Sequence, residues 1–144
     1  MAGGFLTDVL VVIVVLGVMI FIHELGHFLA AKSSGVRVLV FSLGFGKSLL
    51  HIQRGETDYR ISALPFGGYV KMAGDDPSED RRGDRGEFLS QPRWRRFVIV
   101  VMGPAMNVLL AVALLTGLYR FHFQRPAGLQ HRIRSRQPRH AGRI

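Results

Sequence analysis

The sequence predicts a membrane α-helical protein in which two transmembrane helices flank a small membrane-associated β-hairpin unit. Two apolar segments and a glycine-punctuated stretch between them predict this class. Residues 5–31 are apolar except for Thr7 and four ionisable side chains, and residues 97–119 contain no charged side chain. Because roughly 20 apolar residues cross the hydrocarbon core of a bilayer, either segment is long enough to span it.

The first segment, placed in residues 1–34, is expected to be a retained transmembrane helix. A cleaved signal sequence has basic residues before its apolar core and a cleavage site of small residues after it. This segment has no Lys or Arg before it and no such cleavage site before Lys32. The second transmembrane helix is expected over residues 91–121. Its start is a cationic collar, residues 91–96, in which Trp94 suits the headgroup layer of a membrane.

The region between the helices, residues 35–90, is expected to be a membrane-associated β-unit followed by a mobile loop. Glycine clusters and a Gly-Glu-Thr-Asp turn at residues 55–58 separate segments rich in β-branched and aromatic residues. Residues 75–86 are charged and poor in apolar side chains, which predicts the mobile loop. The expected strands are residues 36–41, 49–54, 59–64 and 69–72.

The net charge of +9 is concentrated at the C-terminus, where residues 120–144 carry seven arginines and no acid. This basic stretch lacks interleaved aromatic residues, so no nucleic-acid partner is expected. Residues 122–144 are predicted to be a disordered tail, and we hypothesise that it arises from a frameshift or premature end of translation. Translating the other two reading frames beyond Gln124 would test this hypothesis.

Membrane orientation follows from the Lys and Arg residues of the central loop, since cytoplasmic loops of membrane proteins are enriched in them. The loop holds 12 such residues and the N-terminal flank holds none. The N-terminus is therefore expected outside the cell membrane and the loop in the cytoplasm. The arginine-rich tail would then lie outside, which conflicts with the same rule.

The motif His23-Glu24-Leu25-Gly26-His27 has the spacing H-E-x-x-H. On a helix, residues four positions apart lie on one face, so both imidazoles can reach one metal ion. Glu24 stands beside them, where it can act as general base on a metal-activated water. The alternative is that these side chains lie at a helix end and reach the interface. Their depth in the apolar segment argues against it, because unpaired ionisable groups are costly there.

A hydrolytic zinc site needs three protein ligands and a water, and the sequence supplies only two good ones. His51, Asp75 and Asp76 lie in the loop, and none of them is clearly placed to reach a metal inside the membrane. The second apolar segment contains Gly103-Pro104-Ala105-Met106-Asn107. Its small residues are typical of close helix packing, and Asn107 could serve either packing or contact with a substrate.

The chain resembles the N-terminal part of the site-2 protease family of intramembrane zinc metalloproteases, peptidase M50, most closely its regulator-of-sigma-E protease branch. The motifs that carry the resemblance cover residues 5–121 and occur in the family's order. They are the His23–Phe28 motif, the glycine-rich segments Phe41–Lys47 and Pro65–Met72, and the Gly103–Asn107 motif.

The resemblance implies that His23 and His27 bind zinc and that Glu24 is the general base. It also implies that the β-unit enters the membrane from the cytoplasmic side and offers an edge to an unwound substrate helix. The substrates would be single-span proteins such as anti-sigma factors, and the location the inner cell membrane, as a multi-pass protein. The residues expected to contact substrate are Gly67, Gly68, Tyr69 and Asn107.

Family members continue beyond the second span into extracytoplasmic PDZ domains and further spans, one of which carries an Asp as the third zinc ligand. This chain shows none of these, so a missing C-terminal half could supply the ligand and the chain alone could be inactive. The alternative function is a non-catalytic membrane module that binds metal or a substrate helix. A third hypothesis, a membrane anchor whose basic tail binds acidic lipid or RNA, rests only on the seven arginines.

Overall fold

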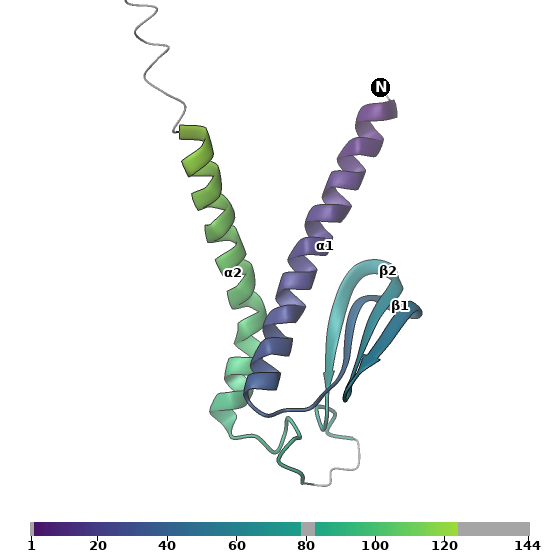
Figure 1. Ribbon diagram of the computed structural model, residues 1–144, viewed down its shortest axis with the longest axis vertical. Coiled ribbons are helices and arrows are strands. Elements are labelled where there is room, and N and C mark those ends of the chain that lie inside the picture. The colour runs from purple at the N-terminus through teal and green to yellow at the C-terminus, as the bar shows by residue number, and fades with distance from the viewer. Residues whose placement is uncertain (1, 79–82, 124–144) are drawn as a thin grey trace, which may run out of the picture. The chain divides into compact units, whose positions relative to one another are not determined.

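The computed structural model describes residues 2–78 and 83–123, which form two long helices and one β-sheet (Figure 1). Along the chain the elements are α1 (Ala2–Ser33), β1 (Val38–Arg54), β2 (Thr57–Met72) and α2 (Arg93–Phe123). The chain divides into two units, Met1–Leu110 and Ala111–Ile144. The first unit contains the sheet, α1 and the start of α2. Residues 122 and 123 of the predicted disordered tail belong to α2, and the rest of the tail lies outside the described residues. Residues 79–82 of the predicted mobile loop also lie outside them.

The two apolar segments of the sequence are helices, as predicted. Each contains a stretch long and apolar enough to cross a membrane, Gly4–Ser33 in α1 and Arg93–Phe121 in α2. Most of their large apolar side chains are exposed, including Phe5, Leu10 and Leu115. A surface of this kind would be unstable in water, whereas a lipid environment accommodates it.

The sheet differs from the four short strands that the sequence predicts. Two long antiparallel strands, β1 and β2, bend so that residues 40–43 of β1 pair with both residues 58–61 and residues 68–71 of β2. The first half of β1 therefore lies between the two halves of β2. The expected breaks are bends inside the strands, because Gly44 and Gly67 adopt positive φ angles of 90° and 127° that bulkier residues rarely adopt.

The hairpin turn is also tighter than expected. Arg54 pairs with Thr57, so only Gly55 and Glu56 form the loop between the strands. Gly55 has a φ angle of 62°, which a two-residue hairpin turn requires. The edge halves of the sheet are consequently the segment before this turn and the segment that ends β2 at Met72.

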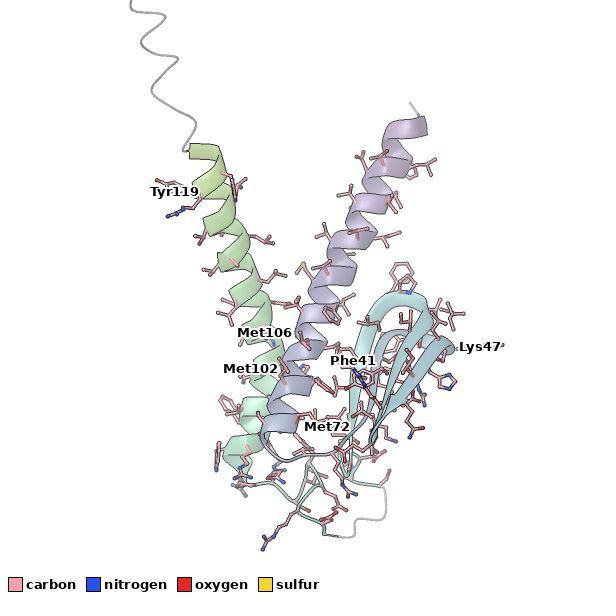
Figure 2. The ribbon with its side chains drawn as sticks, in the orientation of Figure 1. Phe41, Lys47, Met72, Met102, Met106 and Tyr119 are labelled. Carbon is pink, nitrogen blue, oxygen red and sulfur yellow. The ribbon has the colours of Figure 1, made fainter. Side chains whose placement is uncertain are left out.

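A small core joins the end of α1 to the sheet and to the beginning of α2. Its buried members are Ala30, Ala31, Val36, Val38, Met72 and Ile99. Phe41 of β1 adds a second contact, because its ring meets Phe21 and Phe28 of α1 edge-on at 6.1 and 5.3 Å between centroids. Figure 2 shows Phe41 and Met72 among the side chains of the sheet. These contacts fix the sheet beside the histidine-bearing turns of α1.

The absence of a side chain at Gly26 lets α1 approach α2. A Cβ atom there would overlap the Met102 carbonyl oxygen and lie 2.9 Å from Met106 Cγ. Met102 and Met106, labelled in Figure 2, lie one turn apart on α2. The glycine of the H-E-x-x-H motif is thus a packing residue, as well as a neighbour of the candidate metal ligands.

We predict that Gly26→Ala destabilises the contact between the helices by about 1–3 kcal/mol, the usual cost of overpacking a tight site. Gly17→Ala is the matched control, because a Cβ on this other α1 glycine would meet nothing within 4 Å. Unfolding free energies in mixed micelles would measure both. Equal stabilities for the two variants would contradict the packing assigned to Gly26.

Candidate metal centre

The two histidines of the motif lie on one face of α1, as the spacing predicts. Their rings are 4.9 Å apart between centroids and meet edge to face at 77°. His23 and His27 are each partly buried, as is Glu24 between them in the sequence. The helix therefore presents two imidazoles and a carboxylate together, within the apolar segment.

His27 is oriented by the backbone of α2. Its Nδ1 lies 2.8 Å from the carbonyl oxygen of Ile99, a residue 72 positions away and almost completely buried. A carbonyl oxygen can only accept, so Nδ1 carries the proton and donates it. Nε2 then keeps its lone pair, and this is the tautomer that can bind a metal.

Gly103 of α2 marks the point on which the two imidazoles converge. A Cβ atom at this position would overlap Nε2 of His27 and lie 2.8 Å from Nε2 of His23. Both nitrogens therefore lie close to the backbone of Gly103, where a side chain at residue 103 would overlap them. Sequence reasoning assigned this glycine to helix packing. Its role beside the histidines was missed because it depends on contacts with His23 and His27, which lie 76 or more positions earlier in the sequence.

Asn107, one turn beyond Gly103, contacts the other histidine. Its side-chain amide nitrogen lies 3.3 Å from Nδ1 of His23, while its Oδ1 is buried and unbonded within residues 2–78 and 83–123. Metal binding through Nε2 of His23 needs the proton on Nδ1, and a half-turn of the amide lets Oδ1 accept a hydrogen bond from that N–H group. Asn107 is thus placed to orient a candidate ligand. Its contact with a substrate remains a prediction.

Glu24 lies against the edge of the sheet. A Cβ atom on Gly68 of β2 would lie 2.9 Å from Glu24 Cγ and 2.8 Å from the carbonyl oxygen of Ser42. Pockets of about 300 and 280 Å³ open on this carboxylate. Gly68 contributes to both pockets, so the motif and the sheet edge together line two neighbouring pockets.

The remaining predicted substrate residues line the same two pockets. Tyr69 lines the larger pocket together with Glu24 and His27. Its ring stacks on Phe45 at 6.1 Å between centroids and 9° between planes. Gly67 lines the smaller pocket, and a Cβ there would overlap the Phe45 ring. The structure therefore places all of the predicted site residues around these two pockets, and their roles in binding a substrate stay predictions.

A third metal ligand is not supplied by the part of the chain that the structure describes, where no three His, Cys, Asp or Glu side chains group to hold a metal. Asp75 lines the larger pocket, but its Oδ2 accepts a hydrogen bond from the Met72 backbone N–H at 2.9 Å. Ser78 donates to Asp76 through its backbone and hydroxyl, which holds the pKa of that carboxyl below its usual value. His51 pairs with Arg60 in the sheet.

The donor set nevertheless fits two of the ligands of a zinc site. Neutral imidazole nitrogens are common zinc ligands, and each histidine has a polar partner at Nδ1 that sets the direction of its ring. The space in front of both Nε2 atoms is kept free by Gly103. Tetrahedral zinc would require a further protein ligand in addition to these two.

Comparison with known proteins identifies the family. Residues 11–135 match the model of Peptidase family M50. A protein named "Putative zinc metalloprotease" from Clostridium acetobutylicum is 47% identical over 107 residues, which are 74% of this chain and 31% of that protein. Another of that name from Chlamydia trachomatis is 42% identical over 113 residues, 72% of this chain and 18% of the relative.

A third relative, from Campylobacter jejuni, is 44% identical over 108 residues, covering 72% of this chain and 29% of its own length. The chain thus spans less than a third of the length of these relatives. The matched residues include residues 11–33 of α1 with its histidines, both strands and all of α2. The family match agrees with the resemblance carried by the sequence motifs, and this chain belongs to peptidase family M50.

Proposed function

We propose that this chain carries the metal-binding and general-base part of a zinc endopeptidase that acts within a membrane. The observation that carries the proposal is the convergence of the two Nε2 atoms, from His23 and His27, on the side-chain-free position of Gly103. Membership of peptidase family M50 and relatives named as zinc metalloproteases support it.

Each residue of the site has a role in this reaction. His23 and His27 would hold a zinc ion, which when bound lowers the pKa of water towards 7 and polarises a carbonyl group. Ile99 and Asn107 would fix the directions of the two imidazoles. Glu24 would take a proton from the attacking water and return it to the leaving nitrogen of the peptide.

The substrate would bind as an extended strand beside residues 68–72. The sheet partners of these residues all lie on one side, in residues 38–43 of β1. Adding a strand to the open side would satisfy the backbone groups of a substrate segment unwound from its helix. Glu24 lies against Gly68 at this edge, so the peptide bond would reach the carboxylate.

We further propose membrane-spanning segments of single-span proteins, such as anti-sigma factors, as substrates. The apolar surfaces of α1 and α2 support an integral membrane location, and the family resemblance points to the inner membrane. The Lys and Arg residues of the central loop favour a cytoplasmic position for that loop and an extracytoplasmic N-terminus. The third zinc ligand would come from a C-terminal half like that of the longer relatives.

The proposal predicts different behaviour for the chain alone and for an extended protein, made by joining residues 1–123 to the C-terminal remainder of the Clostridium acetobutylicum relative. Two histidines cannot hold zinc in a fixed geometry, so the chain alone should retain little zinc and leave a transmembrane reporter intact. The extended protein should retain zinc and cleave the reporter.

Measured zinc content and reporter cleavage separate the two candidate functions. If the extended protein binds zinc but leaves the reporter uncut, the alternative function, a non-catalytic metal-binding module, is correct. The fact that favours this alternative is that the described residues provide only two ligands. An extended protein that neither binds zinc nor cleaves would contradict both functions.

A further inference from the structure

A second, polar pocket of about 400 Å³ lies away from the histidines, where α1 ends and α2 begins. Residues of the loop between the helices and of the first turn of α2 line it, among them Ser34, Arg85, Ser90, Gln91 and Arg95. Nη1 of Arg95 donates to the Ser34 carbonyl at 3.4 Å and to Gln91 Oε1 at 3.1 Å. The Gln91 amide donates in turn to the Arg85 carbonyl. These bonds tie the walls of the pocket together.

The charge of this pocket is positive. Two arginines and no acid line it. Of the nearby acids, Asp84 pairs with Arg37 at 2.8 Å, and the buried Glu87 accepts a hydrogen bond from Ser90 at 3.3 Å. The Arg85 side chain is exposed and makes no ion pair or hydrogen bond within residues 2–78 and 83–123. Among the described residues, no side chain occupies its guanidinium, which can therefore bind an anion.

The position of the pocket along the helices suggests which anion it meets. Ser34 follows the last residue of α1, and Pro92 precedes the first residue of α2, so the pocket lies at one end of both apolar segments. Trp94 lies beside it with 63% of its surface exposed, and the Arg95 guanidinium sits 5.3 Å from its ring centroid. Exposed tryptophan beside arginine is typical of the headgroup layer.

We propose that this pocket binds the phosphate of an anionic phospholipid headgroup, through Arg85 and Arg95. Guanidinium groups form paired, charge-assisted hydrogen bonds to phosphate oxygens, which are stronger than neutral hydrogen bonds. The lipid would lie against Trp94 and join the end of α1 to the start of α2. The inference rests on the proposed membrane location, and it is independent of zinc binding and of proteolysis.

The test uses Trp94, which is the single tryptophan of the chain. The full chain is reconstituted in phosphatidylcholine bilayers, and its fluorescence is quenched by nitroxide-labelled phosphatidylglycerol or phosphatidylcholine. The proposal predicts preferential quenching by the anionic lipid. Arg85→Gln should reduce that preference at least about tenfold, because it removes hydrogen bonds to phosphate as well as one surface charge.

Arg93→Gln is the matched control, since Arg93 is exposed on the same collar but does not line the pocket. It should reduce the preference by no more than about fivefold, the effect of one cation near an anionic surface. Equal losses in the two variants would overturn the proposal in favour of diffuse attraction. Displacement of the lipid by inorganic phosphate at constant ionic strength would also overturn it, by showing a site for free phosphate.

Discussion

The variant Gly103→Ala is expected to abolish tight zinc binding by the extended protein. The added methyl group would occupy the volume on which Nε2 of His23 and His27 converge, and it would overlap the latter atom. Mutation of residues that orient metal ligands typically lowers metal affinity about 10- to 100-fold. We expect a loss at least this large, because the added methyl group overlaps a ligand atom itself. Zinc retained against a chelator measures the effect without reference to activity.

Gly117→Ala is the control for this variant, because it adds the same methyl group to another glycine of α2. A Cβ at Gly117 would meet nothing within 4 Å, so zinc retention should be unchanged. A Gly103→Ala protein that folds and retains zinc as well as its Gly117→Ala counterpart would show that the space beside Gly103 is not the metal position.

The variant Glu24→Gln is expected to lower the rate of reporter cleavage by about 10²- to 10⁴-fold, the usual contribution of a general base. Glutamine keeps the shape of the side chain but cannot accept the proton of the attacking water. Because Glu24 lies against Gly68 and is assigned as the base rather than as a ligand, zinc content should stay the same. The cleavage rate and the zinc content of one preparation check both parts.

Glu56→Gln serves as the control for the lost negative charge. Glu56 lies in the hairpin turn and pairs with Lys32 at 2.7 Å on the surface, where an ion pair contributes little to stability. The Glu56→Gln variant of the extended protein should cleave the reporter at the normal rate. Cleavage that survives Glu24→Gln would show that another group acts as base, and loss of zinc in that variant would make Glu24 a ligand.

The shared face of the two candidate metal ligands could be predicted from the sequence because it follows from helix geometry alone. His23 and His27 are four residues apart on one helix, so their common face needs no tertiary information. Both helices could be predicted for a similar reason, since length and apolar composition define them. The structure confirms both helices and the shared face of the two histidines.

The partners of the histidines could not be predicted in this way. Ile99 acts through its backbone carbonyl, which any residue would provide, and Gly103 acts through the absence of a side chain. Both contacts depend on how closely α1 and α2 pack. The strand boundaries were wrong for a local reason, because Gly44 and Gly67 bend the strands without ending them.

The measurement that tests the central claim most directly is X-ray absorption spectroscopy of zinc bound to the extended protein. The account predicts two imidazole nitrogens at about 2.0–2.1 Å from the metal, with one lost in each of the variants His23→Ala and His27→Ala. A spectrum without imidazole ligands, or one that neither substitution changes, would contradict the assignment of these histidines as a metal centre.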